Sequence, residues 1–413
     1  MIDFRNLDVI LHIGGPKTGS SIMQKYFNDN GEHLNSVGLY YPVHDADKNG
    51  ISGGHWSLVD FLKSGNILKA KEFIEENIRI ANNRNLTLLL SSEHFVDFAS
   101  DFFTLLQGIS FHIISFYRHP IECFVSSYNQ DVKRHYLKLK LEEYSFSNAP
   151  LKPRITGESL LNWLNYFSVN SVYVVFYKKE FNVVNKFFEV LGINSTDFDS
   201  RINKSYTPSA LNLKRIFNKL ISIKDEKFNA SLDQVLQHYS DSIDVVYPSY
   251  IDTLGGETYA YLERIYAPYI QLVQDKFKIK VCLSESAPCG RDIDSLDDIF
   301  KLIKKNRETY DFFRKKLLFQ LSNSPIDSDF YLLIYYFEIG SISNNSFQLS
   351  DATLRNILSD DLLLPDLLRE FSILLSEIGC HKSAYKVIDK ALELRPSGPV
   401  IQQLHRKLAC IIE

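Results

Sequence analysis

The residues most suited to chemistry lie in a short loop near the start of the chain. After the apolar run Val9–Ile13 the sequence continues as Gly14-Gly15-Pro16-Lys17-Thr18-Gly19-Ser20-Ser21, and helical spacing follows over Ser21–Asn28. A glycine-containing loop between a strand and a helix exposes backbone N–H groups to an anion, and the helix dipole favours negative charge there. The loop therefore predicts a phosphate-binding site.

This loop differs from the one in proteins that hydrolyse nucleoside triphosphates. In that motif, G-x-x-x-x-G-K-[ST], the lysine directly follows the second glycine. Here Gly14 and Gly19 have the required spacing, but Ser20 occupies the lysine position and Lys17 lies inside the loop. No convincing aspartate ends a following apolar strand to hold Mg²⁺. These features disfavour an ATPase or GTPase.

The loop instead resembles that of a transferase family. The residues that are similar to the 5′-phosphosulfate loop, P-K-[TS]-G-[TS]-[TS], of sulfotransferases are Pro16, Lys17, Thr18, Gly19, Ser20 and Ser21. These enzymes use 3′-phosphoadenosine 5′-phosphosulfate (PAPS) as donor. Arg118 follows the apolar run Phe111–Tyr117, and Ser126 comes eight residues later, at the spacing with which the family binds the donor's 3′-phosphate. A guanidinium suits that group because it can donate two parallel hydrogen bonds to a phosphate.

The resemblance implies metal-independent, in-line transfer of a sulfuryl group from PAPS to an acceptor hydroxyl. By analogy with soluble bacterial-type members, the acceptor is a carbohydrate or glycoconjugate. Lys17 would stabilise charge on the bridging oxygen, and a general base would take the hydroxyl proton. Glu93 is the favoured base because it follows the predicted strand Thr87–Leu90 at the carboxyl edge of the sheet, where α/β proteins bind ligands. His94 ranks second and His55 is a third candidate, while a capping or ion-pair role for Glu93 stays open.

The elements that must position these residues alternate between strands and helices. Short apolar runs at Val9–Ile13, Thr87–Leu90, Phe111–Tyr117 and Val172–Tyr177 predict buried strands. The stretches between them with helical spacing are Ser21–Asn28, Ile67–Ile80, Pro120–His135 and Ser159–Phe167. This alternation predicts an α/β fold with a central parallel sheet. With the resemblance, we expect a P-loop three-layer α/β/α architecture.

The C-terminal part of the sequence is predicted to be helical. We expect a sulfotransferase domain over residues 1–285, a linker over 286–294 and an all-α domain over 295–413. Apolar and small residues at about 364–397 have the spacing of a tetratricopeptide helix pair, with Pro396 ending the second helix. We expect this region to bind a protein partner or a second copy of the chain.

Composition narrows the classes of protein further. The chain has 413 residues, 45% of them hydrophobic, which is typical of a globular protein. Its net charge of −4 argues against non-specific binding to nucleic acid, which needs a basic surface. Its five cysteines are scattered, so neither a zinc site nor a disulfide framework is indicated. No apolar run approaches the ~18 residues of a membrane span, and the start lacks a signal-peptide pattern. We therefore expect a reduced, cytoplasmic protein.

Two other functions stay open from the sequence alone. The loop could serve a nucleotide-dependent kinase, or the chain could be a non-catalytic nucleotide-binding scaffold with a helical interaction tail. The identity of the acceptor also stays open, because its pocket would be built from loops of unspecific composition, at Tyr40–Gly54 and Tyr136–Ile155.

Overall fold

The computed structural model describes ten stretches of the chain, which form two compact units. The described residues are 2–44, 54–178, 181–194, 205–243, 254–284, 294–323, 329–334, 336–337, 365–377 and 381–412. Unit 1 consists of Met1–Asp131, Leu139–Lys204 and Val245–Arg291. Unit 2 consists of Val132–Lys138, Ser205–Asp244 and Asp292–Glu413.

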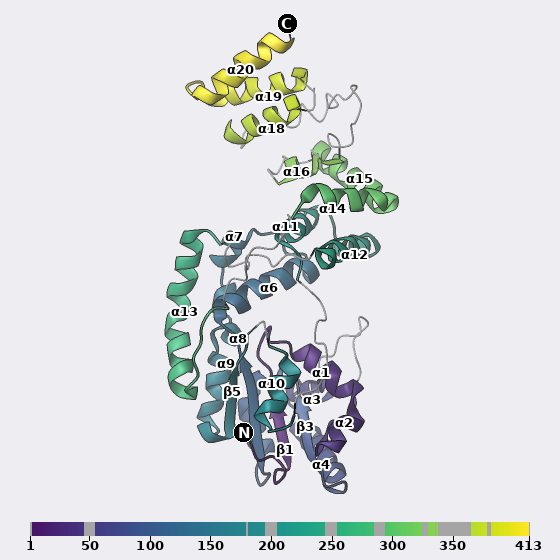
Figure 1. The fold of residues 1–413 in the computed structure, drawn as a ribbon, viewed down its shortest axis with the longest axis vertical. Helices are drawn as coiled ribbons and strands as arrows, with labels where there is room; N and C mark the ends of the chain where they lie inside the picture. The colour runs from purple at the N-terminus through teal and green to yellow at the C-terminus, as the bar shows by residue number, and fades with distance from the viewer. Residues whose placement is uncertain are drawn as a thin grey trace. The chain divides into compact units, whose positions relative to one another are not determined.

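A five-stranded parallel sheet forms the centre of unit 1 (Figure 1). Its strands are β1 (Val9–His12), β2 (Leu39–Tyr40), β3 (Thr87–Ser91), β4 (Phe111–Tyr117) and β5 (Val172–Phe176). Their order is β2-β3-β1-β4-β5, and every pairing is parallel. The four apolar runs in the sequence match β1, β3, β4 and β5 to within one residue at each end. The predicted α/β fold with a central parallel sheet is confirmed.

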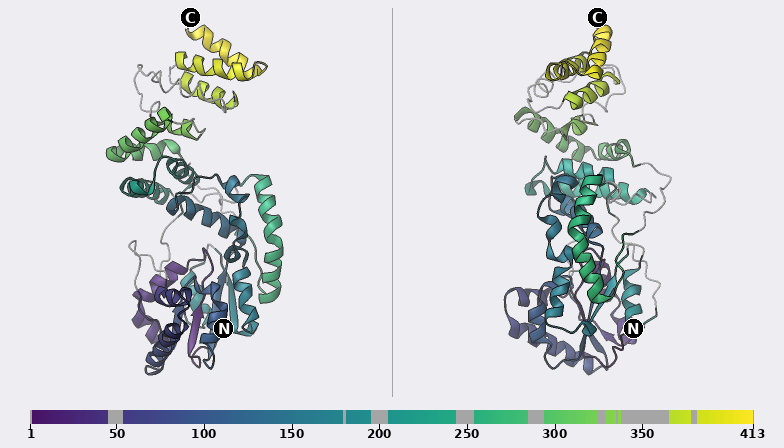
Figure 2. Two further views of the ribbon diagram at one scale, coloured as in Figure 1. Left: turned by 180° about the vertical axis from the view of Figure 1, so that it is seen from behind. Right: turned by 90° about the vertical axis from the view of Figure 1, so that its left-hand side faces the viewer.

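Helices pack against both faces of this sheet, which Figure 2 shows from two further directions. On one face, Ile10, Ile114 and Phe116 pack with apolar residues of α1 (Ser20–Asp29) and α10 (Val183–Val190). On the other face, the neighbouring strand residues pack with apolar residues of several helices, among them α3 (Trp56–Lys63), α4 (Ile67–Asn82) and α5 (Ala99–Leu105). Alternate residues of the central strands thus pack into two apolar layers, one on each face of the sheet. Because a shift by one residue would exchange the two faces, this pattern fixes the strand register.

Along the sequence, the remaining helices of unit 1 lie between successive strands or after the last strand, β5. They are α2 (Gly31–Ser36), α6 (Pro120–Arg134, which ends in unit 2), α7 (Leu141–Ser145), α8 (Pro153–Thr156), α9 (Glu158–Leu161) and α13 (Gly256–Phe277). The predicted single helix over Ser159–Phe167 is wrong, because α9 ends at Leu161 and a 3₁₀ turn follows over Asn162–Asn165. Pro268 lies inside α13, which continues without a break from Gly256 to Phe277. This proline lies on an exposed part of the helix, where water can satisfy the carbonyl that loses its partner.

The described part of unit 2 consists mainly of helices. They are α11 (Pro208–Phe217), α12 (Glu226–Ser242), α14 (Leu296–Lys305), α15 (Arg307–Asn323), α16 (Phe330–Ile334), α18 (Pro365–Glu377), α19 (His381–Leu394) and α20 (Pro399–Ile412). Ser372 Oγ donates a 2.8 Å hydrogen bond to Ala384 O, which joins α18 to α19, and Ala384 and Ala391 are buried. Small residues at these positions let two helices pack closely. Whether this pair is a tetratricopeptide unit stays a prediction.

Most of the predicted linker lies outside the described residues, as does residue 364 at the start of the predicted helix pair. Asp294, the last residue of that linker, accepts hydrogen bonds from Thr207 Oγ1 at 2.9 Å and Ser209 N at 2.7 Å. The proposed domain boundaries therefore stay predictions. Across the ranges described above, no helix combines the length and the apolar character that crossing a membrane requires.

Candidate functional site

The loop Ile13–Gly19 joins β1 to α1 and lies directly against the ends of two neighbouring strands. Ser115 Oγ donates a 2.7 Å hydrogen bond to Gly14 O. A Cβ atom on Gly15 would stand 1.8 Å from Phe116 O, and one on Gly14 would stand 2.5 Å from the Cα of Glu93. The two glycines therefore allow the loop to touch β4 on one side and the segment after β3 on the other. This contact brings Glu93 beside the loop.

The end of the loop prepares the start of α1 for an anion. Lys17 and Gly19 have left-handed backbone conformations, with φ of 61° and 81°. Thr18 is buried, and its hydroxyl donates a 2.8 Å hydrogen bond back to Gly15 O. Ser20, the first residue of the helix, is 3% exposed, and its buried hydroxyl oxygen has no hydrogen-bond partner among the described residues. A buried, unpaired hydroxyl at a helix N-terminus suits an anionic ligand, which would satisfy it.

Arg118 lies next to the same loop. It follows β4, and its Nη1 donates a 2.9 Å hydrogen bond to Lys17 O. Its Nε donates to Glu122 Oε2 at 3.1 Å, in an ion pair whose side chains are 14% and 5% exposed. The guanidinium also lies 5.4 Å from the centre of the Tyr177 ring. The arginine is thus held in one orientation, beside the predicted phosphate loop.

One face of α6 carries Ser126 to this loop. Glu122 binds Arg118 and, two turns further along, Gln130 Oε1 accepts a short hydrogen bond from Lys17 Nζ. Ser126 lies four residues from each of them, so helical periodicity places it on the same face, between the two contacts. The structure therefore brings together the loop, Arg118 and Ser126. Glu122 and Gln130 were not singled out from the sequence.

Cys123, on α6, lies close enough to three charged residues for each of them to affect its pKa. Its thiol donates to Pro16 O at 3.3 Å. Burial raises the pKa of Cys123 to about 11, while the charges of Arg118 and Lys17 act to lower it and that of Glu93 acts to raise it. At neutral pH the residue is therefore a thiol, which is a poor nucleophile. The three residues whose charges act on Cys123 are the predicted phosphate ligand Arg118, the loop residue Lys17 and the favoured base Glu93.

His94, the second candidate base, has its basic nitrogen engaged. Arg154 Nη2 lies 3.0 Å from Nδ1 of His94, and a guanidinium can only donate. The neutral ring therefore carries its proton on Nε2, and Nδ1 accepts. Burial lowers the pKa of His94, and the charge of Arg154 lowers it further.

His55, the third candidate, is buried and bonded to the backbone at both ring nitrogens. Ser91 N donates to Nδ1 at 3.0 Å, and Nε2 donates to Pro42 O at 3.1 Å. Burial lowers the pKa of His55 to about 3. The ring thus connects the start of α3 to the end of β3.

A second buried histidine lies in β1. His12 Nδ1 and Ser91 Oγ are 2.7 Å apart, and Gln24 Nε2 donates to the same hydroxyl at 3.1 Å. Burial lowers the pKa of His12 to about 3. This polar network ties β1, β3 and α1 together below the loop.

An exposed tryptophan stands next to the candidate bases and was not identified from the sequence. Trp56 is 42% exposed, and its ring meets that of His94 edge to face at 4.8 Å between centroids. Lys63 Nζ lies 4.2 Å from the centre of the Trp56 ring. The sequence places it directly after His55, two residues beyond the segment Tyr40–Gly54 that was predicted to help form the acceptor pocket.

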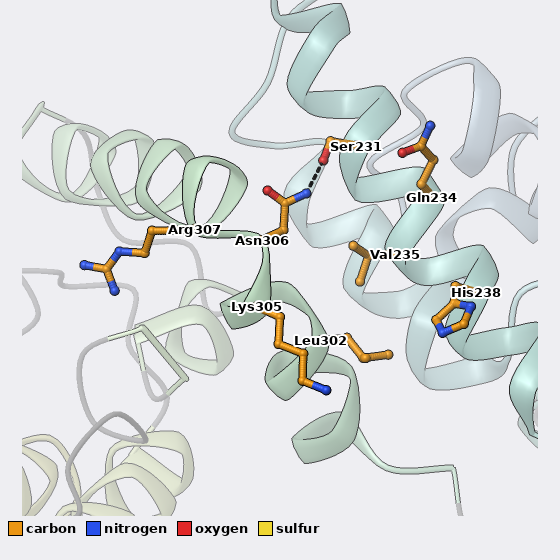
Figure 3. A pocket seen from close by; sticks show the side chains of 8 residues that line it. All are labelled: Ser231, Gln234, Val235, His238, Leu302, Lys305, Asn306 and Arg307. Atoms are coloured by element: carbon orange, nitrogen blue, oxygen red, sulfur yellow. Dashed lines mark hydrogen bonds between the residues drawn. The ribbon is translucent and has the colours of Figure 1, made fainter.

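Unit 2 contains a surface pocket of its own (Figure 3). Its volume is about 530 Å³, and its lining residues are Ser231, Gln234, Val235, His238, Leu302, Lys305, Asn306 and Arg307. Asn306 Nδ2 donates to Ser231 Oγ at 2.7 Å, as Figure 3 shows, and Arg307 pairs with Asp311. None of the predicted site residues lines this pocket.

Within the described ranges, His, Cys, Asp and Glu side chains form no group of three or more that could hold a metal ion. Comparison with known proteins adds no further information: no protein-family model, no curated protein and no solved structure matches the chain. The residues around the loop after β1 are therefore the features of the chain that point to a function.

Proposed function

We propose that unit 1 transfers a sulfuryl group from PAPS to a hydroxyl of a carbohydrate or glycoconjugate acceptor. The observation that carries the proposal is the grouping of Arg118 and the Ser126 face of α6 beside the loop that ends in the unpaired hydroxyl of Ser20. A donor with phosphates at both the 5′ and 3′ positions needs two anion sites. The loop would take the 5′-phosphosulfate, and Arg118 with Ser126 would take the 3′-phosphate.

The sheet topology supports this assignment. The segments after β3, β1 and β4 carry Glu93, the loop and Arg118, and these strands are neighbours in the sheet. The chain crosses from β3 to β4 on the other side of β1, and ligands of open parallel sheets bind at such a switch point. We propose that unit 1 is a P-loop three-layer α/β/α domain on these grounds, and that the helices of residues 295–413 form the all-α domain expected from the sequence.

The transfer step follows from the charges around the loop. The acceptor oxygen attacks sulfur as the bond from sulfur to the bridging oxygen breaks, and 3′,5′-adenosine bisphosphate leaves. Lys17, together with the backbone N–H groups of Thr18–Ser20, would stabilise the negative charge on the leaving phosphate. Glu93 would accept the hydroxyl proton, because its backbone lies against Gly14 and it is half-buried.

The acceptor class has its own support in Trp56. An exposed indole beside the proposed base can stack against the apolar face of a sugar ring, and its neighbour His94 can donate from Nε2. The carbohydrate part of the proposal rests on this residue and on the resemblance.

A thermal-shift comparison tests the proposed function. Addition of 3′,5′-adenosine bisphosphate without metal should raise the unfolding temperature, because a ligand that binds only the folded state stabilises it. Equal concentrations of 5′-AMP should raise it less, since 5′-AMP lacks the phosphate assigned to Arg118. Arg118→Ala should remove most of this difference, while Arg79→Ala, on the distant helix α4, serves as the matched control.

Stabilisation by ATP with Mg²⁺ alone would favour the nucleotide-dependent kinase instead. Binding of 3′,5′-adenosine bisphosphate without sulfate transfer from labelled PAPS to any oligosaccharide would favour the non-catalytic scaffold. A screen of acceptors with labelled PAPS then identifies the substrate.

A further inference from the structure

Glu122 is the residue of the site whose role the proposed function does not explain. It is a nearly buried carboxylate next to a predicted phosphate site, where negative charge should be unfavourable. Its two oxygens have different partners. Oε2 accepts from Arg118 Nε at 3.1 Å, and Oε1 accepts from the backbone N–H of Ser284 at 2.6 Å.

We propose that Glu122 is a positioning residue that makes Arg118 selective for a 3′-phosphate, and that the Ser284 amide holds Glu122 in place. The inference rests on the proposed function and extends it to the source of donor specificity. It makes Ser284, which follows α13 and is 162 residues from Glu122 in sequence, part of the donor site.

The hydrogen-bond arithmetic of Arg118 supports this role. A guanidinium has five N–H donors. The Nε–H group donates to Glu122, and one N–H group of Nη1 donates to Lys17 O. Among the described residues these are the hydrogen bonds that Arg118 makes, so three N–H groups remain, on Nη1 and Nη2. Two of them are on Nη2 and one is on Nη1, and these N–H groups can donate to a phosphate.

Only a carboxylate of this length can make both contacts. Arg118 Nε and Ser284 N are both donors, so each oxygen of residue 122 must be an acceptor. A glutamine has a single oxygen, and its NH₂ group would face one of the two donors. Glu122→Gln therefore breaks one contact while keeping nearly the same volume. Charge-assisted hydrogen bonds contribute about 1.5–3 kcal/mol, which corresponds to roughly a 10- to 100-fold effect.

The experiment measures the affinities of the full chain for 3′,5′-adenosine bisphosphate and for 5′-AMP by calorimetry. The wild-type chain should prefer the bisphosphate, and Glu122→Gln should reduce the ratio of the two affinities by about tenfold or more. Affinity for 5′-AMP should change little, which separates loss of specificity from general damage to the loop. Glu75→Gln, an exposed carboxylate on α4, is the matched control.

A second pair of variants tests the backbone contact. Ser284→Pro removes the N–H that Glu122 accepts from, whereas Ser284→Ala keeps it. The proline variant should reduce the ratio of affinities, and the alanine variant should leave it at the wild-type value.

The outcomes separate the two proposals. If the wild-type chain does not prefer the bisphosphate, the proposed function and this inference both fail. If it does, but Glu122→Gln and Ser284→Pro keep the ratio within twofold of wild type, the proposed function stands and the role of Glu122 is overturned.

Discussion

Replacement of Gly15 by alanine is the most direct perturbation of the proposed site. The new Cβ would stand 1.8 Å from Phe116 O and 3.3 Å from Cγ2 of Thr18. The first distance is about 1.6 Å shorter than an ordinary contact of a Cβ atom, so the loop must move away from β4 by more than ~1 Å. Overpacking of this kind costs about 1–3 kcal/mol of folding free energy. A displacement of ~1 Å in a site also costs about 100-fold in function.

Two measurements check this expectation, with Gly31→Ala as the control. Gly31 is the first residue of α2, a Cβ there has no neighbour within 4 Å, and alanine favours a helix by up to about 1 kcal/mol. Urea unfolding should therefore show a loss of stability for Gly15→Ala and none for Gly31→Ala. Calorimetry should show that only Gly15→Ala weakens binding of 3′,5′-adenosine bisphosphate. Equal affinities for the two variants would refute the proposal that this loop holds the donor.

Three further predictions concern the base and the buried charges. Glu93→Gln should lower the rate of sulfate transfer by about 100-fold or more, and His94→Gln by much less; the reverse order in an assay with labelled PAPS would move the base to His94. Burial lowers the pKa values of His12 and His55 to about 3, so the stability that they contribute is complete above their unfolded pKa of about 6.5 and is lost as the pH falls towards 3. Urea unfolding at pH 5.5 should show a loss of about 1.4 kcal/mol for each histidine, and His135→Gln, an exposed control, should leave this pH dependence unchanged. Burial of Asp329 would raise its pKa, but hydrogen bonds from Arg215 and Lys219 lower the pKa to about 2. The carboxylate should therefore contribute about 2 kcal/mol to the free energy of unfolding above pH 4, and this contribution should disappear between pH 4 and 2. Asp329→Asn should remove this acid transition and, because it removes the carboxylate charge that pairs with the buried Arg215, should destabilise unit 2 at pH 7 by about 3 kcal/mol.

The sheet could be predicted because buried parallel strands are continuous apolar runs, and four of the five strands have this pattern. β2 could not, since it has two residues, which is too short for any periodicity to be visible. The failure at Ser159–Phe167 has a different cause. Helical spacing of apolar residues is also satisfied by a short helix followed by a 3₁₀ turn, and packing decides between them: Trp163 Nε1 donates to Val96 O at 2.9 Å, which anchors the turn.

The grouping of residues around the loop could be predicted only in part. The loop residues, Arg118 and Ser126 were singled out because their types and spacing resemble the motifs of a known family, and their role in binding an anion stays a prediction. Gln130 was missed because its partner Lys17 is 113 residues away, and the contact of Glu122 with Ser284 spans 162 residues, although its ion pair with Arg118 has local spacing. Contacts of this range depend on how β4 and α6 lie against the loop, which no local pattern encodes. The grouping of chain segments into units 1 and 2 depends on the same kind of contact.

The choice among the three candidate bases depends on lone pairs, which only the structure reveals. A base needs an available lone pair within reach of the acceptor proton. Both nitrogens of His55 are used by the backbone, and the lone pair of His94 is directed at Arg154. A histidine base would therefore have to break an existing hydrogen bond before each transfer. Glu93 has two oxygens, so one can hold a local partner while the other accepts the proton, and this favours the carboxylate over either imidazole.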